Sequence, residues 1–274
     1  MELLHAVALG AIQGVTEFLP ISSSGHLVLL QSLFGIKGPE IFFDVALHVG
    51  TLASVCVFFS KDLKEIAAAL FSAFTWSSGK IGLRQQLSQE PEMRLLGLII
   101  VGTVPTVLLA FVFRPMAEML FSSVRLVGIM LLVTGLLLWF TRGLNRKGRN
   151  PAQLTFWDAV CVGLMQGLAI LPGISRSGTT IATALFRGIH RETAARYSFL
   201  LSIPAIVGAM ALELYKARAS VMPPLGPALL GACVAAVAGY AALKVLIHLV
   251  KRGNLYTFAP YCWLLGVVVI AWSP

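Results

Sequence analysis

Two segments of the chain share a sequence pattern, and together they carry carboxylate, hydroxyl, histidine and arginine side chains. The first runs from Gln13 to His26 and reads QGVTEFLPISSSGH, and the second runs from Gln166 to Thr179 and reads QGLAILPGISRSGT. They align without a gap, 153 positions apart. Side chains of these types are suited to holding a phosphate group and to promoting its transfer or hydrolysis. The sequence therefore predicts that two distant segments contribute to one phosphate-binding site.

In both segments, serines and a glycine precede an apolar run. Serine in this position is typical of a helix N-cap, and helix N-termini that point at one spot form an anion site. We expect phosphate binding by two groups of residues, with helix capping alone as the alternative for the serines. The residues are Ser22, Ser24 and Gly25 in the first segment, and Ser175, Ser177, Gly178 and Thr179 in the second.

Four side chains are candidate catalytic residues: Glu17, Ser23, His26 and Arg176. Arg176 offers a planar fork of donors suited to phosphate oxygens. At membrane depth an arginine costs about 2.5–3.5 kcal/mol on insertion scales, so it needs an anionic ligand or Glu17 as its partner. His26 could act as a general base toward Ser23, or toward water. The alternatives are structural: a loop-locking salt bridge for Arg176, an interhelical hydrogen bond for Glu17 and a satisfied core histidine for His26.

Glu17 is also a candidate metal ligand, since it lies four residues after Gln13 on the same helix face. With a single carboxylate, we expect a labile Mg²⁺ or Ca²⁺ ion, with Mn²⁺ possible, held partly by the substrate. Asp44 and His48 form a second pair four residues apart. They could complete the metal or proton-transfer shell, or they could be an interface pair facing lipid.

The composition is that of an integral membrane protein. The 274 residues are 57% hydrophobic and only 12% charged, with a mean hydropathy of +0.85, whereas soluble domains average about 25% charged residues. The net charge of +9 falls in short loops between apolar runs. It therefore indicates membrane topology and lipid headgroups rather than nucleic acid. We expect one membrane domain over 1–274, buried single cysteines and no removable signal peptide.

The elements that must position these residues are helices. About six transmembrane helices are expected near 41–60, 95–113, 121–141, 193–213, 226–249 and 257–273. The segments 2–34 and 154–188 are apolar but broken by the motifs, so each is predicted to be a re-entrant helix-loop-helix. The charged segment 61–94 is predicted to be a loop with an amphipathic surface helix at about 63–74. The predicted fold class is all-α, a polytopic membrane helical bundle.

The basic residues predict the orientation of this bundle. If both broken segments are re-entrant, one face carries fourteen lysines and arginines and the other carries five, namely Lys37, Arg114, Arg125, Lys216 and Arg218. The positive-inside rule puts the basic face, including 61–94, in the cytoplasm and both termini outside. The halves, about 1–141 and 154–274, then form an inverted-topology repeat. Their broken loops can meet near the bilayer midplane, where such repeats place binding sites.

The two motifs resemble those of bacterial undecaprenyl-diphosphate phosphatases of the bacitracin resistance type. The stretch from Gln13 to His26 is similar to the family's first signature, and LPGISRSGTT from Leu171 to Thr180 is similar to its PGxSRSGxT signature. The resemblance extends to FDVALHVGT from Phe43 to Thr51 and to the overall length. Many members have glutamate where this chain has Gln13, which weakens a model with two metal-binding carboxylates.

The resemblance implies a function and a location. Such enzymes hydrolyse undecaprenyl diphosphate to the monophosphate carrier lipid reused in peptidoglycan synthesis, depend on a divalent metal, and protect against bacitracin, which competes for the polyprenyl diphosphate. By position, Glu17 belongs to the acidic motif, Ser23 and His26 to the catalytic loop, and Arg176 to the phosphate clamp. A multi-pass protein of the bacterial inner membrane, with its active site open to the periplasm, is implied. The rival functions are a lipid-phosphate transporter or flippase and a non-catalytic scaffold.

Overall fold

The computed structural model describes residues 3–33, 41–76, 91–116, 119–120, 123–144, 147–217 and 225–272. Over these residues the regular elements are helices, and the only β-type pairing is an isolated bridge between Arg149 and Ile189. The α-helices are α1 (Leu3–Phe18), α2 (Ser23–Leu33), α3 (Ile41–Phe58), α4 (Ser60–Trp76), α6 (Pro91–Phe113), α8 (Val124–Trp139), α9 (Phe156–Leu168), α10 (Arg176–Phe186), α11 (Arg191–Ala217), α12 (Leu225–Arg252) and α13 (Ala259–Trp272). Short 3₁₀ turns cover Arg114–Met116, Pro151–Gln153 and Leu255–Phe258. The prediction of an all-α membrane bundle is confirmed.

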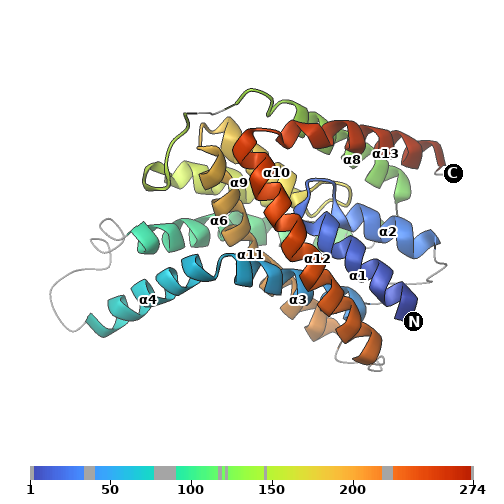
Figure 1. Cartoon of the computed structure of the whole chain (residues 1–274), viewed down its shortest axis with the longest axis horizontal. Helices are drawn as coiled ribbons and strands as arrows, with labels where there is room; N and C mark the ends of the chain where they lie inside the picture. Colours follow the sequence, from blue (N-terminus) through green and yellow to red (C-terminus); the bar gives the residue numbers. More distant parts are fainter. Residues whose placement is uncertain are drawn as a thin grey trace.

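Both broken segments form helical hairpins. The chain leaves α1, turns over residues 19–22 and returns as α2, which packs against α1 (Figure 1). In the second half, α9 ends at Leu168, the loop covers 169–175, and α10 packs back against α9. With 11 to 16 residues each, the four helices are shorter than the roughly 20 residues that a bilayer crossing requires. The helix-loop-helix prediction for 2–34 and 154–188 therefore holds over the described residues.

The predicted spans all coincide with helices, but their lengths differ. Within the described residues, four helical segments are long and apolar enough to cross a membrane: α6 with its following 3₁₀ turn, most of α11, α12, and α13 with its preceding turn. The count rises to five if α3 and α4, which bend by 77° at their junction, form one span. The prediction of six also included α8, whose 16 residues fall short of this length. The predicted surface helix at 63–74 is present as part of α4.

Glycines set the closest helix contacts. The hairpin helix α1 packs along α12, and α9 packs along α6. A Cβ atom added at Gly10 would lie 2.5 Å from the carbonyl oxygen of Gly231, and one at Gly163 would lie 2.0 Å from that of Gly102. Small residues let membrane helices approach until their backbones touch. Gly10 and Gly163 occupy matching positions in α1 and α9. A glycine contact of the same kind therefore packs each hairpin against its neighbouring span.

A polar cluster fastens the second hairpin at its open end. The buried Asp158 carboxylate accepts two hydrogen bonds from Arg149, at 2.7 and 2.9 Å, and one from Arg187 at 2.8 Å. Thr155 caps α9 and donates to the same carboxylate at 2.8 Å. The hydrogen bonds that Arg149 donates to Asp158 raise the pKa of its guanidinium, so this arginine stays charged. The cluster thus ties the start of α9 to the end of α10.

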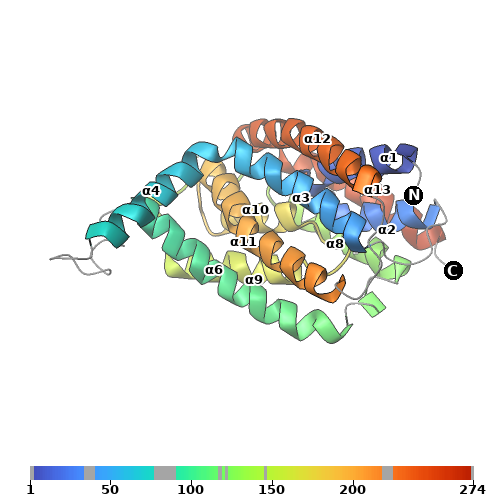
Figure 2. The ribbon, with the colours of Figure 1, turned by 90° about the horizontal axis from the view of Figure 1, so that it is seen from below.

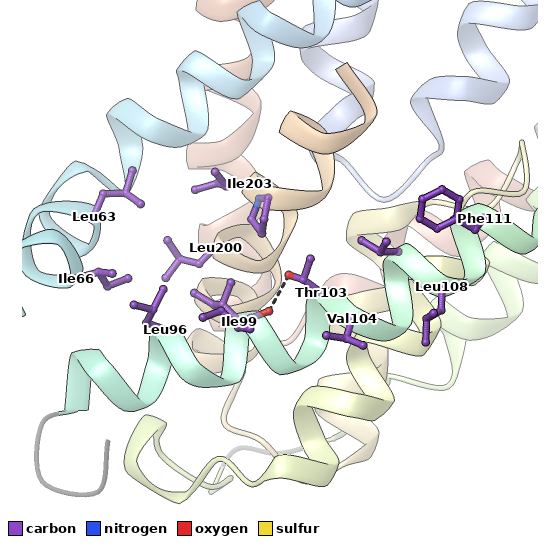
Figure 3. Close-up of a pocket in the computed structure, with 13 residues that line it drawn as sticks. Leu63, Ile66, Leu96, Ile99, Thr103, Val104, Leu108, Phe111, Leu200 and Ile203 are labelled. Carbon is purple, nitrogen blue, oxygen red and sulfur yellow. Dashed lines mark hydrogen bonds between the residues drawn. The ribbon is translucent and has the colours of Figure 1, made fainter. Parts of the chain in front are cut away.

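The ends of the bundle are distinct in both views. Helix α1 begins and α13 ends at one end of the long axis, and α4 projects from the opposite end (Figures 1 and 2). An apolar groove of about 520 Å³ lies between α4, α6 and α11 (Figure 3). Its lining includes Leu63, Ile99, Phe111 and Leu200 and carries no charged side chain. None of the predicted site residues lines this groove, so the chemistry must lie elsewhere.

Candidate active site

The first loop is held by a serine in an unusual backbone conformation. Ser22 has a φ of +69°, a left-handed value that costs an ordinary residue about 1–2 kcal/mol. In this conformation its Oγ accepts a hydrogen bond from the Gly25 amide at 3.3 Å, and its carbonyl accepts the His26 amide at 3.2 Å. Ser24 Oγ lies 3.3 Å from Ser22 Oγ. The loop therefore delivers the chain into α2 with Ser22 acting as its cap.

The second loop also ends in a serine cap, but a different residue adopts the left-handed conformation. Ser175 is the N-cap of α10 and accepts the Gly178 amide at 3.2 Å, while its own Oγ lies 3.2 Å from Ser177 Oγ. Here the left-handed residue is Gly173, with φ of +96°, and its carbonyl accepts the Thr134 hydroxyl at 3.0 Å. The capping alternative thus describes Ser22 and Ser175, which are equivalent by position. Phosphate binding by the loop serines stays a prediction.

The two loops touch each other reciprocally. A Cβ atom at Gly25 would lie 3.6 Å from Gly173 Cα, and one at Gly178 would lie 3.0 Å from Pro20 Cβ. Gly25 corresponds to Gly178 in the motif alignment, and Pro20 corresponds to Gly173. Each loop therefore packs its glycine against the matching position of the other loop. This contact brings the N-termini of α2 and α10 together, as the sequence predicted.

Glu17 is the point where both loops meet. Its Oε2 accepts hydrogen bonds from Ser23 Oγ at 2.6 Å and from Gln13 Nε2 at 3.1 Å. Its Oε1 accepts a hydrogen bond from Arg176 Nη2 of the second loop, which makes a buried ion pair. The sequence left Glu17 and an anionic ligand as possible partners of Arg176, and in the structure Arg176 pairs with Glu17. The ion pair leaves Arg176 Nη1 buried and, among the described residues, without a hydrogen-bond partner.

His26 engages both of its ring nitrogens. Nδ1 lies 2.7 Å from the carbonyl oxygen of Ser22, and Nε2 lies 2.7 Å from the hydroxyl of Tyr261 on α13. The two rings are nearly parallel, with centroids 5.9 Å apart. Among the described residues His26 makes no hydrogen bond to Ser23, whose hydroxyl turns to Glu17 instead. Sequence reasoning missed Tyr261, which lies in an apolar helix far from both motifs.

The donors for a metal ion are few. Within the described residues, no group of three or more histidine, cysteine, aspartate or glutamate side chains is arranged to hold a metal. The backbone carbonyl of Asp44 lies 2.8 Å from His48 Nδ1. Beside Glu17, the Gln13 Oε1 atom is buried and has no partner within the described chain. Carboxylate and amide oxygens suit a hard divalent cation, provided that the substrate supplies the remaining ligands.

Of the other predicted residues, Thr179 lies one helical turn into α10. Its backbone amide donates to the Ser175 carbonyl at 2.9 Å, and its buried hydroxyl oxygen has no partner in the described part of the chain. It occupies the position that corresponds to His26 in the first motif. The structure thus brings Glu17, Ser23 and Arg176 into direct contact, with His26 on the helix that follows Ser23.

Comparison with known proteins identifies a family. The model of the bacitracin resistance protein BacA family matches residues 6–268 of this chain. A protein named undecaprenyl-diphosphatase from Desulfatibacillum aliphaticivorans is 51% identical over 271 residues, covering 98% of both chains. Proteins of the same name from Desulfosudis oleivorans and Desulforapulum autotrophicum are 50% and 45% identical, again over 98% of both chains.

Proposed function

Because this chain belongs to the bacitracin resistance protein BacA family, we propose that it hydrolyses undecaprenyl diphosphate to undecaprenyl phosphate and inorganic phosphate. The observation that carries the proposal is the convergence of both loops on Glu17, which leaves a buried Arg176 nitrogen beside two helix N-termini with no partner among the residues that the structure describes. A multi-pass membrane protein with this site can take a lipid whose diphosphate enters the bundle while its prenyl chain stays in hydrocarbon. The product would return to peptidoglycan synthesis.

The loops would bind the terminal phosphate. Within the described part of the chain Arg176 Nη1 has no acceptor, and Glu17 fixes the other end of the guanidinium, so the fork is already oriented before the substrate arrives. The amides at the starts of α2 and α10 add the positive ends of two helix dipoles. The hydroxyl of Thr179 completes the set of donors, together with that of Ser23 once its hydrogen turns from Glu17 to the phosphate. Stabilisation of the phosphate charge is the main catalytic contribution expected in phosphoryl transfer.

His26 would provide the base. Glu17 is a poor candidate because its oxygens already accept hydrogen bonds from Arg176, Ser23 and Gln13. The proposed attacking group is therefore water, which loses a proton toward His26 as its oxygen bonds to the terminal phosphorus. The phosphorus–oxygen bond to the carrier breaks, and its electron pair leaves with undecaprenyl phosphate. In this scheme Ser23 holds the phosphate and is not the nucleophile.

A divalent cation fits the donors beside Glu17. The Glu17 carboxylate and the unpartnered Gln13 Oε1 would hold Mg²⁺, Ca²⁺ or Mn²⁺ together with the diphosphate oxygens. When bound, such an ion would neutralise charge on the diphosphate. Asp44 is left out of this set, since the described residues include no cluster of carboxylates and histidines that joins it to Glu17.

The proposed setting is the bacterial inner membrane, with both termini and the site opening on the periplasmic side. In support, α1 begins and α13 ends at the end of the bundle opposite α4. Most lysines and arginines fall on the α4 side by the sequence count. Bacitracin would compete with the enzyme for the diphosphate substrate. The names of the relatives do not favour a lipid transporter or flippase.

The test is phosphate release from undecaprenyl diphosphate by the purified protein in detergent, with and without EDTA. We expect metal-dependent release that is lost in His26→Ala. His248→Ala is the matched control, because His248 is an exposed histidine on α12 outside the site, and it should behave as the unchanged protein. Failure of the folded protein to release phosphate would contradict the proposal, and lipid translocation in vesicles would then be measured.

A further inference from the structure

The hydrogen bonds of His26 determine which of its nitrogens can act as a base. Its Nδ1 faces the carbonyl oxygen of Ser22 at 2.7 Å, and a carbonyl can only accept. Nδ1 must therefore carry a hydrogen, and in the neutral ring the lone pair lies on Nε2. That lone pair faces the Tyr261 hydroxyl at 2.7 Å. The hydroxyl of Tyr261 then donates to Nε2, and it occupies the only basic position on His26.

From this geometry we infer that Tyr261 relays the proton from the attacking water to His26. The inference rests on the proposed function and adds a residue to its machinery. Tyr261 is 44% exposed, and because its hydrogen points at Nε2, its oxygen keeps lone pairs that can accept a second hydrogen bond. A phenol hydroxyl is both donor and acceptor, as a relay requires. The rings of His26 and Tyr261 are nearly parallel, and the hydroxyl oxygen lies 2.7 Å from Nε2.

The relay conserves protons. The water hydrogen passes to the Tyr261 oxygen while the Tyr261 hydrogen passes to His26 Nε2, so the phenol stays neutral throughout. The water oxygen bonds to phosphorus as the bond to the carrier breaks. The imidazolium then returns its proton to solvent by the reverse route. Ser22, through its carbonyl, keeps Nδ1 protonated at every stage.

The decisive variant is Tyr261→Phe, which removes the hydroxyl and keeps the ring that stacks on His26. We expect kcat to fall about 100-fold with little change in KM, which is the lower end of what general acid–base catalysis contributes. Tyr256→Phe is the matched control, because Tyr256 packs against Trp139 and Arg142 away from the motifs. It should keep full activity.

A double-mutant cycle shows whether Tyr261 acts through His26. If it does, Tyr261→Phe causes no further loss of activity in a His26→Ala background. Losses that multiply in the double variant, or activity that rises in Tyr261→Phe, would overturn the relay. A rise would mean that the hydroxyl only covers Nε2 until substrate displaces it.

A second measurement does not depend on turnover. In protein labelled with ¹⁵N-histidine, the Nε2 resonance of His26, assigned through His26→Gln, should shift in Tyr261→Phe and stay fixed in Tyr256→Phe. An unchanged resonance would disprove the hydrogen bond and with it the relay. The resonance could shift although the unchanged protein releases no phosphate. That result would support the His26–Tyr261 hydrogen bond and contradict the proposed function. The relay would then be rejected as well, because there would be no reaction for it to serve.

Discussion

Replacing Arg176 by alanine should damage both stability and turnover, for different reasons. The ion pair with Glu17 is largely buried, with side-chain exposures of 17% for Arg176 and 7% for Glu17. Removing one partner of a buried pair costs about 3–5 kcal/mol, because the remaining charge is stranded. Glu17 would keep the hydrogen bonds from Ser23 and Gln13. We therefore expect the unfolding free energy to fall by about 3 kcal/mol, the lower end of that range.

The same change removes the proposed phosphate donor, Nη1. Arginines that stabilise a transferring phosphoryl group contribute about 10³- to 10⁵-fold in kcat, so Arg176→Ala should lose at least about 10³-fold. The combined variant Arg176→Ala with Glu17→Gln separates the two effects. It strands no charge, so most of the lost stability should return, whereas activity should not.

The assays are reversible unfolding in mixed micelles with increasing SDS, and phosphate release from undecaprenyl diphosphate. An unfolding free energy for Arg176→Ala equal to that of the unchanged protein would refute the buried ion pair. Recovery of turnover in the combined variant would refute the phosphate role of Arg176. A combined variant that is no more stable than Arg176→Ala would show that the stranded charge is not the cause of the loss.

Three further outcomes follow from the contacts. Gly163→Ala should lower the unfolding free energy by about 1–3 kcal/mol in the same SDS titration, the usual cost of overpacking, because the new Cβ would meet the Gly102 carbonyl. Gly208→Ala, where a Cβ meets nothing within 4 Å, is the control. Ser23→Ala should lower kcat about 10²- to 10³-fold, the effect of losing one charge-stabilising donor, and total loss of phosphate release would instead identify Ser23 as the nucleophile. Gln13→Leu should raise the Mg²⁺ concentration needed to restore release after EDTA, and an unchanged Mg²⁺ titration would exclude Gln13 as a ligand.

Much of the fold follows from hydropathy and from the motif repeat. Apolar runs of sufficient length locate the spans, and the short apolar halves around each motif locate the hairpins α1–α2 and α9–α10. Hydropathy does not reveal where a helix bends. The predicted span over 41–60 coincides with α3, which ends at Phe58, and the chain then bends by 77° into α4. Nor does it fix the length of α8, which ends at Trp139.

The site was predictable to the extent that it lies within the motifs. Glu17 and Arg176 were expected to face each other or a ligand, and the structure pairs them. His26 was expected to act on Ser23 or on water, and among the described residues it makes no hydrogen bond to Ser23, although the two are three residues apart. The left-handed turn at Ser22 starts α2 so that Ser23 faces Glu17 and His26 faces α13. Tyr261 could not be found from sequence, because a single tyrosine in an apolar helix carries no spacing signal.

The side chains that donate to Glu17 lie where the two motifs differ. Ser22 and Ser175 occupy matching positions and both cap a helix, so the shared residues build the frame. At the next position the first motif has Ser23 and the second has Arg176, and both side chains donate to Glu17. The position that matches Glu17 in the second motif is Ile170, which supplies no second carboxylate.

A carboxylate at position 170 would therefore test this asymmetry. Ile170→Glu would add a negative charge in the second loop. In the first motif, the position that corresponds to Arg176 is Ser23, so no second arginine is available to pair with this charge. We expect it to compete for Arg176 and to weaken phosphate binding, which would appear as a raised KM for undecaprenyl diphosphate. Ile170→Gln, which has nearly the same shape without the charge, should leave KM closer to normal. Equal KM values for the two variants would show that charge at this position does not reach the site.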